Sequence, residues 1–256
     1  MTEISSNKIR NIILIGKTGN GKSTLANVLS GTDKFEESGS GFSQTQKIQT
    51  EEFWHEGIRY RLIDTPGICD TELSQQEVSN QIVEACYKLS GGLNQVLLIS
   101  RGKFTDEELE AYDFLKDAFF GDEFTSYTTI VRTGFADFEN ERECERELKK
   151  MVEKKPKLAE LVKSCNKVIH IDNPAIPTKG RASTIISAKE LRTESRKKIL
   201  QHLAEKCDNY YPINLSRLIE KIGLYMNEKE KLRKRLEELE KSNKEERQKI
   251  EEKILI

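Results

Sequence analysis

The segment from residue 16 to residue 24 has the residue types and spacing of a phosphate-binding loop. It consists of Gly16, Lys17, Thr18, Gly19, Asn20, Gly21, Lys22, Ser23 and Thr24, and it matches the pattern G-x-x-x-x-G-K-[ST]. Glycines allow successive backbone N–H groups to converge on phosphate oxygens, and the N-terminus of a following helix adds partial positive charge. We expect Lys22 to contact the β- and γ-phosphates and to act in catalysis, and Ser23 to place its hydroxyl on Mg²⁺. An apolar strand before the loop and a helix after it disfavour the alternative, a plain glycine-rich turn.

A second acidic group follows at Asp64, which ends an apolar strand and begins the pattern D-x-x-G with Gly67. In nucleotide switches such an Asp organises the Mg²⁺ shell, and the Gly N–H contacts the γ-phosphate. Asp-Thr-Pro-Gly is also a good turn, so the switch interpretation depends on the phosphate loop that precedes it. A Ser/Gly-rich loop supplies Ser43 or Thr45 as a further nucleotide-binding hydroxyl. The sequence does not choose between them, and Thr45 joins Ser23 and Asp64 as a candidate metal ligand.

The residue after Gly67 is Ile68, at the position where many small GTPases carry a glutamine that orients water. An apolar side chain cannot orient water. We therefore expect hydrolysis either to be slow or to need a group from elsewhere, since developing phosphoryl charge is poorly stabilised without an added cation.

These residues need a sheet to position them, and the chain alternates strand and helix on the scale of βαβ units. We expect strands over Ile9–Ile15, Gln46–Trp54, Ile58–Ile63, Gln95–Ser100, Tyr127–Thr133 and Lys167–Asp172. We expect helices over Lys22–Ser30, Gln75–Leu89, Asp106–Phe120 and Glu139–Lys163, and helix alone from about Ser187. The alternation predicts an α/β fold of the P-loop NTPase class, a three-layer αβα domain with a mainly parallel six-stranded sheet and a C-terminal helical extension.

Composition and charge exclude several classes of protein. The chain has 256 residues with 42 basic and 43 acidic side chains, and this balance argues against nucleic acid as a partner. The 5 cysteines form no CxxC pair, which favours reduced thiols and a cytoplasmic location. No apolar run approaches the length of about 18 residues that spans a bilayer, so we expect any membrane contact to be peripheral.

The C-terminal segment is much more charged than the rest of the chain. From Arg217 to Ile256, 22 of 40 residues are charged, and leucines at 232, 236 and 239 follow a spacing near that of a heptad seam. About two heptads are present, so a weak or partner-dependent coiled coil competes with an exposed single helix. We expect residues 213–256 to form a charged helical extension that can bind a helical partner.

Three segments carry a family resemblance: the phosphate loop, Asp64-Thr65-Pro66-Gly67, and Gly102-Lys103-Phe104-Thr105-Asp106-Glu107-Glu108. Together they resemble the immunity-associated GTPases, the GIMAP or IAN proteins, and their avirulence-induced plant relatives. The resemblance covers roughly residues 9–173. It implies a guanine nucleotide-binding domain over residues 8–208, related to septins and chloroplast import receptors. Such domains dimerise through the nucleotide face when GTP is bound, and they often assemble at the cytosolic face of a membrane.

The resemblance also implies roles for residues near the base and the phosphates. Asp137 matches the Asp of a degenerate base-recognition motif and would accept hydrogen bonds from guanine N1 and N2, which adenine cannot offer. Phe135 would cover the base, and the Asn173 amide would help to hold it. Lys103 stands where the family usually has an arginine proposed to act across the dimer, so it is a candidate catalytic residue with a less suitable geometry. Arg101 is a neighbouring candidate.

We expect a protein that binds GTP or GDP with Mg²⁺ and hydrolyses GTP slowly, as a nucleotide-dependent dimerisation or assembly switch. The alternative is a non-enzymatic scaffold in which nucleotide stabilises an assembly held by the C-terminal helix. Ile68 and Lys103 are the residues that favour this alternative, because they stand where a water-orienting glutamine and an arginine are expected. A P-loop kinase would need an acceptor pocket and an Arg-bearing lid, and no segment plainly supplies them.

Overall fold

The structure is a computed structural model, and it describes residues 8–37, 48–67, 75–89, 92–153, 155–224 and 227. Its residues fall into two compact units, Met1–Leu215 and Ser216–Ile256. Residues 216–224 of the second unit are helical, and the heptad leucines predicted at 232, 236 and 239 lie outside the described residues. None of the helices in the described ranges is long and apolar enough to cross a membrane.

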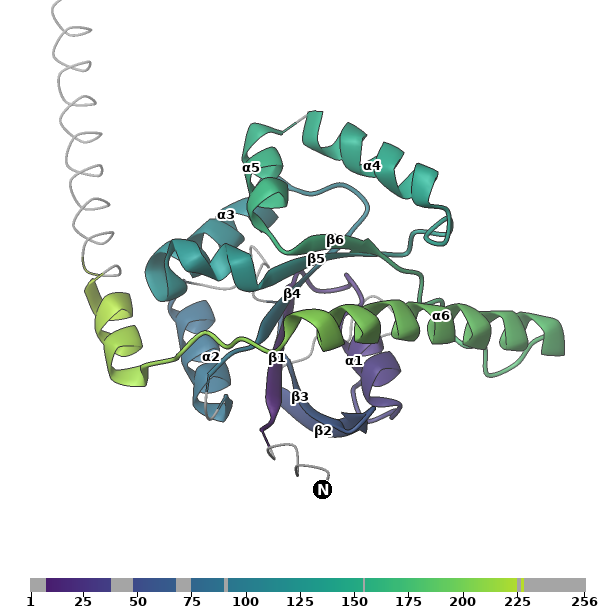
Figure 1. Ribbon diagram of the computed structural model, residues 1–256, viewed down its shortest axis with the longest axis horizontal. Helices are drawn as coiled ribbons and strands as arrows, with labels where there is room; N and C mark the ends of the chain where they lie inside the picture. Colours follow the sequence, from purple (N-terminus) through teal and green to yellow (C-terminus); the bar gives the residue numbers. More distant parts are fainter. Residues whose placement is uncertain are drawn as a thin grey trace, which may run out of the picture. The chain divides into compact units, whose positions relative to one another are not determined.

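The first unit contains a six-stranded sheet in the order β2-β3-β1-β4-β5-β6 (Figure 1). The strands are β1 (Arg10–Gly16), β2 (Gln49–His55), β3 (Ile58–Asp64), β4 (Gln95–Arg101), β5 (Thr128–Thr133) and β6 (Lys167–His170). All neighbours pair in parallel except β2 and β3, which form an antiparallel hairpin. Its turn places Glu56 at φ 49° and Gly57 at φ 76°, the left-handed backbone that tight hairpin turns need.

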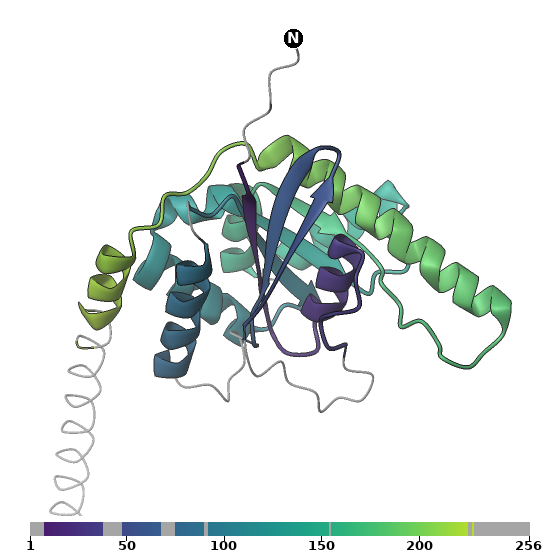
Figure 2. The same cartoon turned by 90° about the horizontal axis from the view of Figure 1, so that it is seen from below.

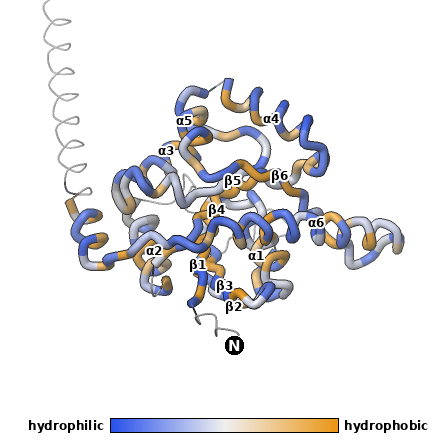
Figure 3. The backbone as a smooth tube through the Cα atoms, in the orientation of Figure 1, coloured by the Kyte–Doolittle hydropathy of each residue, from blue (hydrophilic) through white to orange (hydrophobic). Residues whose placement is uncertain are grey.

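Helices cover both faces of the sheet, which confirms the predicted three-layer αβα fold. They are α1 (Lys22–Ser30), α2 (Gln75–Lys88), α3 (Asp106–Leu115), α4 (Glu141–Glu153), α5 (Pro156–Ser164) and α6 (Ala182–Lys206). Figures 1 and 2 show α1 and α6 on one face and α2 and α3 on the other. The central strands are almost wholly buried, as expected for parallel strands covered on both sides, and Figure 3 shows hydrophobic residues gathered along them.

The core beneath α1 and α6 anchors the elements that carry the phosphate loop. Leu25 and Leu29 of α1 and Leu200 and Leu203 of α6 belong to one buried cluster with apolar residues of β1, β3 and β4. Burying each such side chain contributes about 1.5–3 kcal/mol. The two ends of the phosphate loop are therefore fixed, one by a central strand and the other by a packed helix.

Three helix predictions were wrong in their bounds. The helix expected over Glu139–Lys163 is two helices, α4 and α5, because Pro156 lacks a backbone N–H and begins a new helix at its first turn. The helix expected over Asp106–Phe120 changes from α3 to a π-helical turn at Lys116–Phe120. The helix α6 begins at Ala182 rather than near Ser187.

Candidate nucleotide-binding site

The phosphate loop connects the end of β1 to the start of α1. Gly16 has φ 153°, and a Cβ atom there would lie 2.3 Å from the backbone oxygen of Ile99 on the neighbouring strand. Gly21 adopts a left-handed conformation with φ 91° directly before α1 begins at Lys22. Both glycines are thus required by the backbone, one for close approach and the other for its turn into the helix.

Lys22 is folded over the loop from which it projects. Its ammonium group donates to the carbonyl oxygens of Gly16 at 2.9 Å and Lys17 at 3.1 Å, and the side chain is buried. These contacts hold a positive charge at the phosphate cavity. This is the position in which Lys22 can exchange a carbonyl for a phosphate oxygen.

Asn20 ties the phosphate loop to the rest of the sheet. Its side-chain amide donates to the Ile99 oxygen at 3.0 Å and to Glu108 Oε1 at 2.8 Å, and Thr133 Oγ1 donates to its carbonyl at 2.7 Å. The other oxygen of Glu108 accepts from the N–H of Thr105, whose hydroxyl in turn accepts from the Glu108 N–H, so the pair forms a capping box at the start of α3.

The capping box explains part of the segment Gly102–Glu108 on which the family resemblance rests. Glu108 joins the beginning of α3 to the phosphate loop through a buried carboxylate. Sequence reasoning did not assign this contact. The spacing T-x-x-E between Thr105 and Glu108 predicts the cap, but nothing local to it identifies Asn20 as the second partner.

Ser23 and Asp64, the candidate metal ligands of the two motifs, meet beside the phosphate loop. Ser23 Oγ donates to Asp64 Oδ2 at 2.7 Å, while Asp64 Oδ1 is buried and has no hydrogen-bond partner among the described residues. Burial raises the pKa of Asp64, and the hydrogen bond from Ser23 and the charge of Lys22 offset that effect only in part. A buried carboxylate oxygen without a partner, next to a hydroxyl, is a donor set that fits a hard divalent cation such as Mg²⁺.

A cavity of about 100 Å³ lies over the loop. Its lining consists of Thr18, Gly19, Gly21, Lys22, Ser23, Thr24, Glu36, Glu37, Gly67 and Arg101. The structure therefore brings Gly67, predicted to contact the γ-phosphate, to the same cavity as the phosphate loop. Ser43, Thr45 and Ile68 lie outside the described residues.

Glu37 is an acidic member of this lining that the sequence did not reveal. Arg192 of α6 donates to both of its oxygens, at 3.1 and 2.8 Å, and Asn27 Nδ2 donates to it at 3.1 Å. Burial alone would raise the pKa of Glu37, but the hydrogen bonds from Arg192 and Asn27 outweigh it, so its pKa lies below the usual range. Glu37 is therefore a carboxylate held beside a phosphate cavity.

The predicted base-recognition residues follow β5 and β6, whose ends are adjacent in the sheet. Gly134 has φ 66°, and the Phe135 N–H donates to the Ile171 oxygen at 3.2 Å, which joins the two loops. Asp137 is exposed. Both polar atoms of the Asn173 amide are buried without a hydrogen-bond partner among the described residues. Such an amide is available to a ligand group that enters this corner of the sheet.

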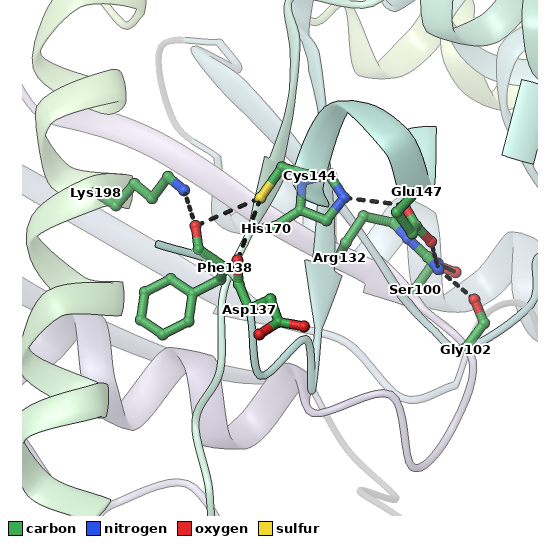
Figure 4. A network of polar contacts seen from close by, with 9 residues as sticks. All are labelled: Ser100, Gly102, Arg132, Asp137, Phe138, Cys144, Glu147, His170 and Lys198. Atoms are coloured by element: carbon green, nitrogen blue, oxygen red, sulfur yellow. Dashed lines mark hydrogen bonds and ion pairs between the residues drawn. The ribbon is translucent and has the colours of Figure 1, made fainter. Parts of the chain in front are cut away.

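A buried polar network lies behind the base loop (Figure 4). Arg132 donates to Ser100 Oγ at 2.8 Å, to the Gly102 carbonyl and to Glu147 Oε1 at 2.7 Å, while His170 Nε2 lies 2.9 Å from Glu147 Oε2. Burial would raise the pKa of Glu147, but its hydrogen bonds to His170 and Arg132 reverse that effect and its pKa is lowered.

Phe135 packs against one member of this network. Its ring centroid lies 4.8 Å from that of His170. Its role in covering a base stays a prediction. His170 thus connects Phe135 of the base loop to Glu147 of α4.

The two cationic candidates of the segment after β4 are separated. Arg101 is exposed and lines the phosphate cavity, whereas Lys103 is exposed and lines a different cavity beside α4. Within the single chain, Arg101 rather than Lys103 lies at the phosphate cavity. The action of either residue on the nucleotide of a second copy stays a prediction.

A mainly parallel sheet of this order, with a phosphate loop after β1 and an Asp at the end of β3, defines a P-loop nucleotide-binding domain. The family model of the AIG1 family matches residues 10–185, and the chain belongs to that family. Immune-associated nucleotide-binding protein 7 of Arabidopsis thaliana is 31% identical over 245 residues, which cover 93% of this chain and 73% of that protein. Immune-associated nucleotide-binding protein 10 of the same plant is 33% identical over 139 residues, 53% of this chain and 30% of that protein.

Solved structures share the fold. Era in complex with MgGDPNP and a segment of 16S ribosomal RNA superposes with a TM-score of 0.53 at 13% identity, covering 81% of this chain and 59% of that one. An Era variant of Aquifex aeolicus bound to GDP and AlF4⁻ gives a TM-score of 0.50 at 16% identity, covering 81% and 58%. Family and fold together support a GTP-binding protein.

Proposed function

We propose that the chain binds GTP and GDP with Mg²⁺, hydrolyses GTP slowly, and uses the bound nucleotide to control dimerisation or further assembly. The observation that carries the proposal is the meeting of Ser23 and Asp64 at a phosphate loop, with one Asp64 oxygen left buried and without a partner among the described residues. A purely structural Asp would be expected to have both oxygens satisfied, so the arrangement supports binding of Mg²⁺ with the nucleotide. The scaffold alternative also binds nucleotide, and turnover is the property that separates it from the switch.

Mg²⁺ would be held by the Ser23 hydroxyl, with Asp64 and the proposed Thr45 completing its surroundings. When bound, the ion neutralises charge on the β- and γ-phosphates. The chain's own groups do the rest of the binding. Lys22 would exchange its two carbonyl contacts for phosphate oxygens. Backbone N–H groups of the phosphate loop would donate to the same oxygens.

Preference for guanine would come from two side chains at the ends of β5 and β6. Asp137 would accept hydrogen bonds from N1 and N2 of guanine, and adenine lacks those donors. The unsatisfied Asn173 amide supports a second contact with the base. A buried amide without a hydrogen-bond partner is energetically costly, and a ligand that satisfies it removes that cost. The resemblance, rather than geometry, assigns Asp137 to this role.

A nucleotide-dependent change of the loop after α1 is supported by the charges that line the cavity. Glu36 and Glu37 belong to the lining, and a triphosphate would bring several negative charges beside them. Like charges at short range are unfavourable, so these residues must move or be screened when the γ-phosphate is present. Movement of Glu37 would break its contacts with Arg192, which couples the loop to α6.

Hydrolysis across a dimer is the proposed route to turnover. Arg101 at the phosphate cavity and Lys103 beyond it are the candidate cations, and Lys103 would act on the partner's nucleotide. We propose residues 8–208 as the nucleotide-binding domain and residues 213–256 as a helical extension. A cytoplasmic location with peripheral membrane contact, and a helical partner for the extension, remain predictions.

Calorimetric titration with GDP, a nonhydrolysable GTP analogue and ATP tests binding. Wild type should bind both guanine nucleotides and discriminate against ATP, Lys22→Ala should lose at least about tenfold in affinity, and Asp137→Asn should lose the preference for guanine. Glu139→Gln, an exposed carboxylate nearby, is the matched control and should behave like wild type. Equal affinity for ATP and GDP in the wild type would refute the guanine assignment.

Sedimentation and phosphate release test the switch. The GTP analogue should increase the sedimentation coefficient relative to GDP in wild type but not in Lys22→Ala. Turnover per protein molecule should rise with protein concentration if the catalytic group comes from a second copy. The enzyme claim fails if no phosphate is released at any concentration, and the switch fails if all nucleotide states sediment alike.

A further inference from the structure

A second cavity, of about 460 Å³, lies where the turn after β4 faces α4 and α5. It shares no lining residue with the phosphate cavity. Phe104 and Leu158 are buried and Met151 is half-buried, so its walls are largely apolar. The volume falls within the range of about 300–1,000 Å³ typical of ligand pockets.

The charged groups of this cavity are lysines with one carboxylate. The carboxylate is Glu147, and it is already paired with Arg132 at 2.7 Å and with His170 at 2.9 Å, as Figure 4 shows. Those two bonds use both of its oxygens. Glu147 therefore contributes little free negative charge to a ligand in the cavity.

The lysines are less completely neutralised. Lys155 pairs with Asp106 at 2.7 Å. Lys103 and Lys150 are exposed, and in the described part of the chain neither forms an ion pair. The cavity thus combines an apolar wall with two cationic groups, and long lysine stems can cover apolar surface while their charges stay in water.

We propose that this cavity binds a single-chain amphipathic anion, with its apolar chain against Phe104, Met151 and Leu158 and its carboxylate or phosphate between Lys103 and Lys150. Apolar burial would supply most of the affinity, because each buried CH₂ group contributes about 0.8 kcal/mol. The lysines would select an anionic head group over a neutral one. The cavity shares no lining residue with the phosphate cavity. Because Lys103 is also the candidate cation for hydrolysis across a dimer, the tests substitute Lys150 and measure binding of the anion rather than GTP turnover.

Methionine methyl resonances provide a direct test. The chain has 3 methionines, at positions 1, 151 and 226, so selective ¹³C-methyl labelling gives few signals, and Met151→Leu identifies the one from the cavity. Decanoate and decyl phosphate are titrated below their micelle concentrations, with 1-decanol and inorganic phosphate as matched probes. We expect one or both anions to shift the Met151 signal saturably, and 1-decanol and inorganic phosphate to bind at least about tenfold more weakly.

The role of Lys150 in binding the anion is tested by charge reversal, because Lys150 lies outside the phosphate cavity. Lys150→Glu should weaken the binding of decanoate or decyl phosphate by about threefold or more. Lys197→Glu, which makes the same charge change at an exposed position of α6, should leave that binding unchanged. Thermal melting of both variants checks that they are folded, and Lys150→Ala, which removes charge without adding a carboxylate, should weaken binding to an intermediate extent.

Binding of only one of the two anions supports the proposal and identifies the head group. Three results overturn it: an affinity for 1-decanol equal to that for the tighter-binding anion, an unchanged affinity for that anion in folded Lys150→Glu, or a Met151 signal that none of the probes shifts.

Discussion

Glu108 is expected to hold the phosphate loop in its binding conformation, and its substitution by glutamine separates that role from helix capping. The Glu108 carboxylate accepts one hydrogen bond from Asn20 Nδ2 at 2.8 Å and another from the Thr105 N–H at 2.9 Å. A glutamine offers one acceptor oxygen where two donors converge, so one buried donor must face an NH₂ group. Losing a hydrogen bond to a charged group costs about 1.5–3 kcal/mol.

Glu108→Gln should therefore lower the free energy of unfolding by about 1.5–3 kcal/mol. Because the lost or strained contact reaches Asn20 inside the loop, GDP affinity should fall as well, by roughly tenfold if about 1.4 kcal/mol of the loss appears in binding. Thr105→Ala is the matched control. It removes the capping hydroxyl, costing about 1 kcal/mol of stability, and leaves the Asn20 contact intact, so GDP affinity should stay near that of wild type.

The assay combines urea unfolding with calorimetric titration of GDP for both variants and for the double variant. Stability alone would not discriminate, since both substitutions weaken the start of α3. The ratio of GDP affinities is the deciding measurement. If Thr105→Ala lowers the GDP affinity as much as Glu108→Gln does, or if neither variant changes the GDP affinity, the link from α3 to the phosphate loop does not position the nucleotide.

Three further predictions follow from the geometry. Gly16→Ala should destabilise the chain by more than about 2 kcal/mol in urea unfolding, because its Cβ would meet backbone, whereas Gly19→Ala, with nothing within 4 Å, should cost only about 1 kcal/mol for its left-handed backbone. His202 lies 2.7 Å from Thr129 Oγ1, and burial lowers its pKa from 6.5 to about 4. Below pH 6.5 the unfolded chain binds a proton that the native chain does not, so the free energy of unfolding should fall by roughly 2 kcal/mol between pH 6.5 and 5, and His202→Asn should flatten this dependence. Glu37→Gln should increase the affinity for a GTP analogue about threefold or more in low salt. The increase should be smaller for GDP, and smaller for either nucleotide at high salt. An unchanged affinity for the GTP analogue would show that the charge of Glu37 does not oppose the triphosphate.

Local sequence patterns predicted the fold because each pattern reflects a physical requirement of the element that it forms. The phosphate loop follows from glycines that the backbone requires, and the order of strands follows from short apolar runs alternating with helices. Pro156 marks the separation of α4 from α5, but the pattern of charged residues continues through it and hides the boundary.

The contacts that complete the site could not be predicted in this way. Glu108 reaches Asn20 across 88 positions of the sequence, and Arg192 reaches Glu37 across 155. Such partners are chosen by the packing of strands and helices, and no spacing rule connects them. The same holds for Arg101, whose place at the phosphate cavity depends on where β4 ends relative to the loop after β1.

The long helix α6 has a consequence for how the chain could be divided. Its 25 residues span about 37 Å, and its buried side chains include Ile199, Leu200 and Leu203, while residues 178–184 are exposed. Cleavage after Lys179 would leave these apolar contacts as the interface between two fragments. The fragments should therefore co-elute from a size-exclusion column, and separate elution would contradict this. The loop before α6 would then be a natural position for a split reporter of nucleotide binding.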